Sequence, residues 1–178
     1  MTGPVLYSAL VVVVGLQRLA EMALSRRNAA WALARGGVET GRGHLPVMIA
    51  VHTALLVGCL AEVWLAHRPF VPALGWPMLA LVVASQGVRA WCVAALGRRW
   101  NTRVIVVPGM APVTSGPYRF LAHPNYAVVV VEGVALPLVH TAWTTAVLFT
   151  LANAALLTVR IRTERRALAG TVSVGSPA

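Results

Sequence analysis

Residues 45–66 read LPVMIAVHTALLVGCLAEVWLA, an apolar run in which Glu62 is the single charged residue. As a helix rising ~1.5 Å per residue, a run of this length crosses the ~30 Å hydrocarbon core of a bilayer. Residues 4–24 and 71–96 form two further runs of similar length and character. These three segments predict membrane-spanning helices.

The composition of the whole chain supports a membrane location. Of its 178 residues, 58% are hydrophobic and 11% are charged, and the mean hydropathy is +0.73. Soluble domains carry about 25% charged residues, and a chain this short cannot bury so much apolar surface in water. The composition therefore excludes a water-soluble domain, a disordered chain and an extended coiled coil.

The last apolar region, residues 126–159, contains Pro137 followed by His140 and Thr141. This pattern predicts a helical hairpin whose first arm, of about 14 residues, reaches only ~21 Å. We therefore predict an all-α integral membrane protein with five transmembrane helices, the last two forming the hairpin. The chain is expected to be one membrane domain, with three spans in residues 1–97, a functional core in 98–168 and a flexible tail in 169–178.

The basic residues predict an orientation. The net charge is +10, and all fifteen basic residues are Arg. Because cytoplasmic loops are enriched in Arg and Lys, the Arg-rich side is expected to be cytoplasmic and the N-terminus external. The use of Arg without Lys is typical of a high-GC bacterial genome and predicts a bacterial inner membrane. Twelve Arg residues fall on one predicted side: Arg26, Arg27, Arg35, Arg42, Arg98, Arg99, Arg103, Arg119, Arg160, Arg162, Arg165 and Arg166.

Two other classes of site are not expected. Nucleic-acid binding needs a basic face on a soluble module, whereas these Arg residues lie between apolar runs and can contact anionic lipid head groups. The five His residues and the two Cys residues, Cys59 and Cys92, show no metal-ligand spacing. We therefore expect neither nucleic acid nor a metal, and we expect both thiols to be small buried groups.

Polar residues gather around the predicted hairpin. His123, Asn125 and Tyr126 lie where its first arm begins, and Arg160 and Glu164 are four residues apart on one face of its second arm. The loop 98–125 and the C-terminal extension of the last helix are thus expected to form a site at the inner membrane surface. The residue types alone also suit an interfacial Tyr and a surface ion pair worth under about 1 kcal/mol.

Charged residues inside the predicted spans need partners or a function. Glu132 lies within the hairpin's first arm, and a carboxylate in lipid is costly. Arg18 and Glu21 are expected to pair with each other or with Arg89. In the second span, His52 and Glu62 could line a substrate cavity, although a structural role is the simpler interpretation of His52.

The order and spacing of these residues resemble the isoprenylcysteine carboxyl methyltransferase family. The resemblance covers roughly residues 98–168, which would form a methyltransferase core. Within that superfamily, the N-terminal half is similar to bacterial alkylpyrone O-methyltransferases associated with type III polyketide synthases. The motifs are Val113, Gly116-Pro117-Tyr118, His123-Pro124-Asn125-Tyr126, Arg160 and Glu164, and, in the N-terminal half, residues 17–21, Arg27-Asn28, residues 37–41, His44 and His52.

The resemblance implies a cofactor and roles for individual residues. Arg160 would be the catalytic residue that faces the anionic group of an amphiphilic acceptor, with Glu132 and His52 as further substrate residues. Ala122 and Arg165 depart from residues common in the family, an Arg and an acid respectively. S-adenosylmethionine would bind through Met110, Ala111, Pro112, Val113, Tyr118, His123, Pro124, Asn125, Tyr126 and Glu164.

Three functions are consistent with the sequence. The first is O-methylation of an alkylpyrone or a similar polyketide lipid. The second is carboxyl methylation of an isoprenylcysteine-like or other lipid substrate at the same cofactor site. The third is a non-catalytic bundle that binds a lipid or quinone. The sequence contains no Gly-rich turn of the kind that soluble nucleotide-binding folds place between a strand and a helix.

Overall fold

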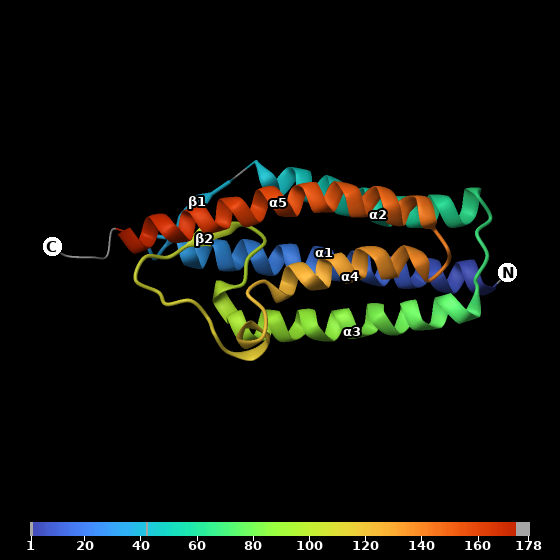
Figure 1. The fold of residues 1–178 in the computed structure, drawn as a ribbon, viewed down its shortest axis with the longest axis horizontal. Coiled ribbons are helices and arrows are strands. Elements are labelled where there is room, and N and C mark those ends of the chain that lie inside the picture. Colours follow the sequence, from blue (N-terminus) through green and yellow to red (C-terminus); the bar gives the residue numbers. More distant parts are fainter. Residues whose placement is uncertain (1, 42, 174–178) are drawn as a thin grey trace.

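A computed structural model describes residues 2–41 and 43–173 and shows an elongated helical bundle (Figure 1). The chain runs back and forth along the long axis, and the segments that join the helices gather at the two ends. The five α-helices are α1 (Thr2–Leu33), α2 (His44–Leu65), α3 (Pro72–Leu96), α4 (Pro124–Leu138) and α5 (Trp143–Ser173).

Four of the helices are long and apolar enough to cross a membrane. These segments are Gly3–Leu33, His44–Leu65, Pro72–Arg99 and Trp143–Glu164. Helix α4 has 15 residues and is therefore only about 22 Å long. The hairpin and its short first arm are present, but the structure supplies four helices of spanning length where we predicted five spans.

Helix α1 extends beyond its predicted end at residue 24, because polar side chains past that point find partners in the protein. The Asn28 amide donates to the carbonyl of Trp100 (2.7 Å), and the backbone N–H of Thr102 donates to Ser25 Oγ (3.0 Å). Ser25 and Asn28 are both buried. These bonds attach the end of α1 to the segment that follows α3.

The Arg-rich connections share one end of the bundle, as the charge pattern predicted (Figure 1). At that end β1 (Val38–Thr40) pairs antiparallel with β2 (Val104–Val106), and the single-turn helices η1 (Gly97–Arg99) and η2 (Gly116–Arg119) lie nearby. Gly109 makes the turn after β2 with a positive φ of 76°. The partner strand β1 was not predicted.

The C-terminal end of α5 differs from the sequence prediction. Helix α5 continues to Ser173, so residues 169–173 are helical where we expected a flexible tail. Residues 174–178 of that predicted tail lie outside the described residues.

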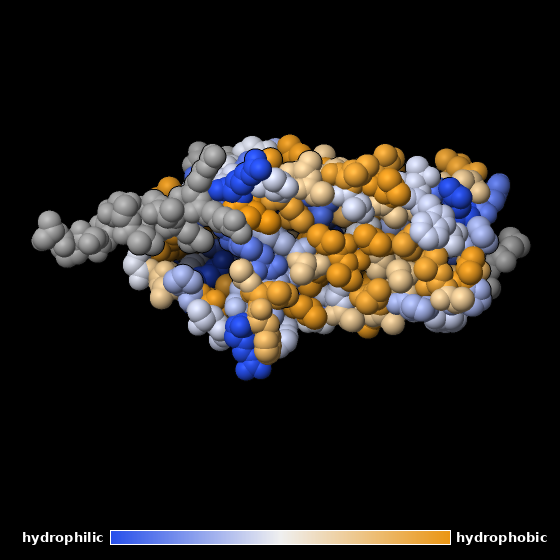
Figure 2. All heavy atoms as spheres, in the orientation of Figure 1, coloured by the Kyte–Doolittle hydropathy of each residue, from blue (hydrophilic) through white to orange (hydrophobic). Residues whose placement is uncertain are grey.

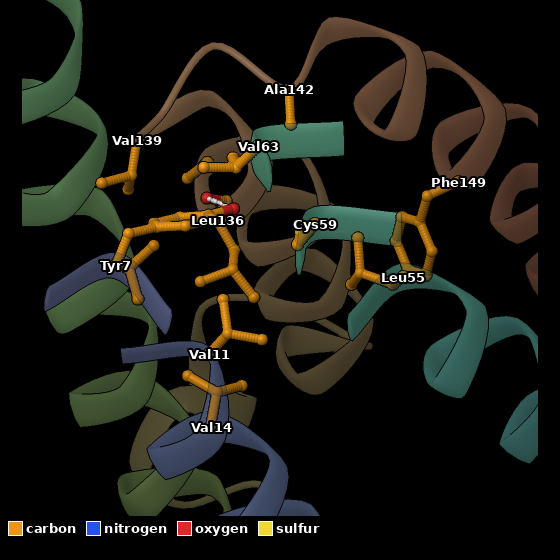
Figure 3. Close-up of a cluster of buried hydrophobic side chains, with 12 residues drawn as sticks. Tyr7, Val11, Val14, Leu55, Cys59, Val63, Leu136, Val139, Ala142 and Phe149 are labelled. Carbon is orange, nitrogen blue, oxygen red and sulfur yellow. Dashed lines mark hydrogen bonds between the residues drawn. The ribbon is translucent and has the colours of Figure 1, made fainter. Parts of the chain in front are cut away.

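The core is a band of apolar side chains where the five α-helices meet (Figure 3). Tyr7 from α1 donates its hydroxyl proton to the carbonyl of Leu136 in α4 (3.1 Å). Cys59 is fully buried in this band, and Cys92 is fully buried elsewhere, so both thiols are the small buried groups that we predicted. Outside the core, exposed apolar residues cover the middle of the visible face, and hydrophilic residues gather towards the ends (Figure 2).

The far end of the bundle places Glu62 differently from our expectation. Its carboxylate accepts the backbone N–H groups of Thr144 (3.1 Å) and Thr145 (2.7 Å), and it pairs with Arg68. A carboxylate at a helix N-terminus binds the unpaired N–H groups there and complements the helix dipole. Glu62 therefore caps α5 at the end opposite the Arg-rich connections and does not line a substrate cavity beside them.

We predict that Gly133→Ala destabilises the protein by about 1–3 kcal/mol, because a Cβ at this position in α4 would overlap with the Phe149 ring of α5. Gly87→Ala in α3 is the control, since a Cβ there meets nothing within 4 Å. Thermal unfolding in detergent should show a lower midpoint for Gly133→Ala and no loss for Gly87→Ala. Equal midpoints would contradict the close packing of α4 on α5.

Candidate active site

The mouth of α4 forms an aromatic and acidic corner. Tyr126 donates its hydroxyl proton to Glu164 Oε2 (2.8 Å), and His123 Nδ1 lies 3.8 Å from the same oxygen. The rings of His123 and Tyr126 stack with centroids 5.2 Å apart and an angle of 20° between their planes. Three residues from two helix ends, which we predicted to form a site, therefore lie in contact. We call them the Tyr126 corner.

Arg160 lies one turn before Glu164 on α5 and is 6% exposed. Its Nη2 donates to the carbonyl of Thr102 (2.9 Å), its Nη1 donates to Met48 Sδ (2.7 Å), and its guanidinium carbon lies 5.7 Å from the centre of the Tyr126 ring. Within the described part of the chain, no carboxylate comes within ion-pair distance of it. A buried cation without a carboxylate partner is costly and can bind an anion strongly.

Tyr118 and Asn125 complete the surroundings of the Tyr126 corner. Tyr118 lies in η2, which packs on α3 at Gly116, where a Cβ would come within 2.9 Å of the Ala95 Cβ. Burial raises the pKa of the Tyr118 phenol above its usual range, so the hydroxyl stays protonated and can donate. Asn125 Oδ1 is buried and has no hydrogen-bond partner among the described residues.

The predicted cofactor segment 110–113 lies in the exposed loop after β2. Arg99 donates to the carbonyl of Ala111 (2.7 Å), which anchors the segment to η1. Met110 is 43% exposed, and Val113 is half-buried. Among the described residues no hydrogen bond joins the segment to Glu164, so its contact with a cofactor stays a prediction. Pro124 is buried in the first turn of α4, where its fixed φ suits the start of a helix.

A second polar cluster lies inside the bundle, away from the connections. Arg18 Nη2 donates to both oxygens of Glu132 (2.9 Å each), and Arg18 Nη1 contacts Glu21 (2.5 Å). Arg89 donates to Glu132 and lies 3.8 Å from Glu21. The two Arg and two Glu residues therefore alternate in a closed ring that joins α1, α3 and α4, and we call them the charge ring.

The charge ring confirms the expected pairing of Arg18 with Glu21 and adds Glu132 as a further partner of Arg18. Arg18 pairs with Glu21 as predicted, and Arg89 lies beside both. The sequence did not predict that Glu132 would bind Arg18 and Arg89 together, although its position in an apolar arm signalled that it needed partners. The structure thus gives Glu132 two Arg partners inside the bundle.

His52 lies beside the charge ring, across a small hollow. Its Nδ1 is 2.8 Å from the carbonyl of Met48, and since a carbonyl only accepts, Nδ1 carries the proton. The hollow contains about 280 Å³ of empty space, counting its opening. It is lined by Val14, Arg18, His52, Leu55, Leu56, Arg89, Val129, Glu132 and Gly133.

The fold and the site define a helical integral membrane protein with a charged aromatic site at one end of the bundle. The model of the isoprenylcysteine carboxyl methyltransferase (ICMT) family matches residues 78–170. The "Uncharacterized protein YpbQ" of Bacillus subtilis (strain 168) is 42% identical over 160 residues, which are 89% of this chain and 94% of that protein. The chain belongs to the isoprenylcysteine carboxyl methyltransferase family.

Family membership indicates an enzyme that transfers methyl groups within a membrane. The matched region begins in α3 and includes η2, α4 and the part of α5 that carries Arg160 and Glu164. The three residues of the Tyr126 corner all lie within this matched region.

We expect Glu132→Gln to lower the stability by about 3–5 kcal/mol, because it removes the carboxylate that Arg18 and Arg89 share inside the bundle. Thermal unfolding in detergent measures the effect. Glu164→Gln is the control, since its side chain is 29% exposed and its loss leaves no buried ion pair broken. If both variants melted together, the charge ring would not stabilise the bundle.

Proposed function

We propose that this protein is an S-adenosylmethionine-dependent O-methyltransferase whose acceptor is an anionic amphiphile, an alkylpyrone or a related polyketide lipid. The observation that carries the proposal is the buried Arg160 guanidinium, which lies over Tyr126 and has no carboxylate in ion-pair distance among the described residues. It provides a fixed cation for an acceptor oxyanion beside a corner suited to the methyl donor.

The residues of the corner fit S-adenosylmethionine. The Glu164 carboxylate can pair with an ammonium group, and it is already oriented by the Tyr126 hydroxyl. Asn125 Oδ1 is a buried acceptor that lacks a donor in the described structure, and the stacked rings of His123 and Tyr126 offer an aromatic face to a cation or a purine. When bound, S-adenosylmethionine supplies an electrophilic methyl group, and the electron pair of the broken carbon–sulfur bond stays on sulfur.

Arg160 can orient and hold the acceptor without taking up a proton. Its contacts with Thr102 and Met48 fix the guanidinium plane, so its other N–H donors, among them the Nε–H that has no partner among the described residues, are held in place before any ligand arrives. A hydroxypyrone or a carboxylate is already ionised at neutral pH, so the acceptor needs no strong general base. The contribution of the protein is then alignment of the reactants and exclusion of water.

The membrane setting supports an amphiphilic acceptor. Exposed apolar side chains surround the middle of the bundle, so a lipid-like molecule can reach the protein from the bilayer. The hollow beside His52 and Glu132 is a candidate place for part of such a molecule, with those two residues as substrate contacts. The similarity of the N-terminal half to alkylpyrone O-methyltransferases favours a pyrone and a functional link to a type III polyketide synthase.

The proposal includes the orientation of the protein in the membrane. The Arg-rich connections and the Tyr126 corner share one end of the bundle, and the positive-inside rule assigns that end to the cytoplasm. We infer a bacterial inner membrane with the N-terminus outside and the cofactor site inside. Membrane lipids would contact the apolar surface between the two ends.

Carboxyl methylation is the second candidate, because Arg160 could hold a carboxylate as well as an enolate and the family is named for that reaction. Assays with a 4-hydroxy-6-alkylpyrone and with an isoprenylcysteine, run in parallel, distinguish the two. Methylation of the isoprenylcysteine alone would replace the pyrone proposal.

Glu164→Gln should weaken S-adenosylmethionine binding at least about tenfold, because it removes the charge that we assign to the ammonium group. Isothermal titration calorimetry of the purified protein measures the dissociation constant. Arg162→Gln is the matched control, since it changes an exposed charge at the same end of α5. Equal affinity in wild type and Glu164→Gln would remove Glu164 from the cofactor site, and no binding to folded wild type would favour a lipid- or quinone-binding bundle.

Arg160→Gln should lower kcat by about a hundredfold or more, while the affinity for S-adenosylmethionine changes by less than about threefold. The reason is that Arg160 is assigned to the acceptor and Glu164 to the cofactor. Steady-state methylation and calorimetric titration provide the two measurements. Normal turnover in Arg160→Gln would show that another group holds the acceptor.

A further inference from the structure

A second hollow lies next to Arg160, between the strand pair, α5 and the first turn of α2. It contains about 220 Å³ of empty space, counting its opening. The motifs of the sequence include Glu39, Gly41, His44 and Arg160, but they did not place these residues around one hollow, because it forms where β1 and β2 pair. It is lined by Glu39, Gly41, His44, Leu45, Thr102, Arg103, Val104 and Arg160.

The polar groups of this hollow are incompletely paired. Arg160 is 94% buried, and its Nε has no hydrogen-bond partner in the described structure. His44 Nδ1 is also buried, and the described residues offer it no partner. A buried polar group without a hydrogen-bond partner is destabilising; a ligand oxygen can accept from the Arg160 Nε–H, and from His44 Nδ1 in the tautomer that carries its proton there.

Glycine keeps the space next to His44 open. Gly41 has a positive φ of 70°, and a Cβ at this position would lie 2.7 Å from His44 Nδ1. Any other residue would therefore strain the backbone and close the hollow against the His44 ring. The unpaired nitrogen and the absent side chain face the same space.

The charge of the lining suits one negative charge. Arg103 contacts Glu39 at 3.4 Å, and Arg160 adds a second cation, so the formal sum over Glu39, Arg103 and Arg160 is +1. Among the described residues no carboxylate lies within ion-pair distance of Arg160, so a monoanion suits this lining. A neutral ligand would leave the buried Arg160 charge uncompensated.

One face of α2 connects this hollow to the hollow at the charge ring. His44, Met48 and His52 are spaced by four residues, so they lie above one another on the helix. Arg160 contacts Met48, and His52 lines the deeper hollow, whose wall includes Leu55 and Leu56. A ligand with a charged head and an apolar chain matches this order of polar and apolar surface.

We propose that His44, Arg103 and Arg160 form the binding site for the anionic head of an amphiphile, with the chain directed along the α2 face towards His52. The inference rests on the proposed function in taking this amphiphile to be the methyl acceptor. It adds His44 and Arg103, from α2 and the loop before β2, as residues that select a singly charged head group.

The test is titration of three probes into the protein in lipid nanodiscs without methyl donor, with empty nanodiscs as the blank. The probes are octanoate, 1-octanol and acetate. His44→Phe and Arg103→Gln should each raise the dissociation constant of octanoate about tenfold and leave that of octanol unchanged. Arg98→Gln, which removes an exposed charge at the same end, should change octanoate binding by less than about twofold.

Several outcomes would overturn the inference. These are octanoate binding that is unchanged in both site variants, an equal loss in Arg98→Gln, or acetate binding as tightly as octanoate to wild type. Arg103→Lys keeps the charge and should lose less affinity than Arg103→Gln, which provides a test if Arg103→Gln does not fold.

The same samples separate this inference from the proposed function. Octanoate binding that depends on His44 and Arg103, in a protein that binds no S-adenosylmethionine, would keep the head-group site and reject the methyltransferase. If the protein binds S-adenosylmethionine normally but its octanoate binding does not depend on His44 and Arg103, the proposed function stands and the head-group site is rejected.

Discussion

The charge ring is the constraint on which the position of the site depends. Helix α4 has only 15 residues, so the bilayer alone does not fix its depth or its rotation. Glu132 fixes both, because its carboxylate binds Arg18 from α1 and Arg89 from α3. Tyr126 lies in the first turn of the same helix. Because the ion pairs of Glu132 position α4, they also position Tyr126 at the mouth of the bundle.

A second set of contacts brings the last helix to that mouth. Arg160 of α5 binds the carbonyl of Thr102, and Thr102 is in turn held by Ser25 at the end of α1. Glu164, one turn further, accepts the Tyr126 hydroxyl proton. The site is thus built from side chains that also join four helices.

Much of this architecture could be predicted from the sequence, because hydropathy reports directly on helices in lipid. The spans, the short hairpin arm and the shared end of the Arg-rich connections all follow from runs of apolar residues and the charges between them. The family motifs placed Tyr126 and Glu164 in one site, and the structure brings them into contact.

The remaining features depend on how distant segments meet. Strand β1 has three residues and exists only through its pairing with β2, so its own sequence carries no strand pattern. The joint binding of Glu132 by two Arg residues depends on the rotation of three helices, which hydropathy does not specify. Glu62 carries the same carboxylate group as Glu132. It lies beside the N-terminus of α5, however, and therefore caps that helix.

The alternation of two Arg and two Glu residues in the charge ring also affects how the protein responds to voltage. A single charge moved across an energised membrane gains or loses about 2.3 kcal/mol per 100 mV. The four charges sum to zero and are joined directly to one another, so the electric field exerts no net force on them. A change in the membrane potential therefore does not pull the charge ring as a unit towards either side of the membrane.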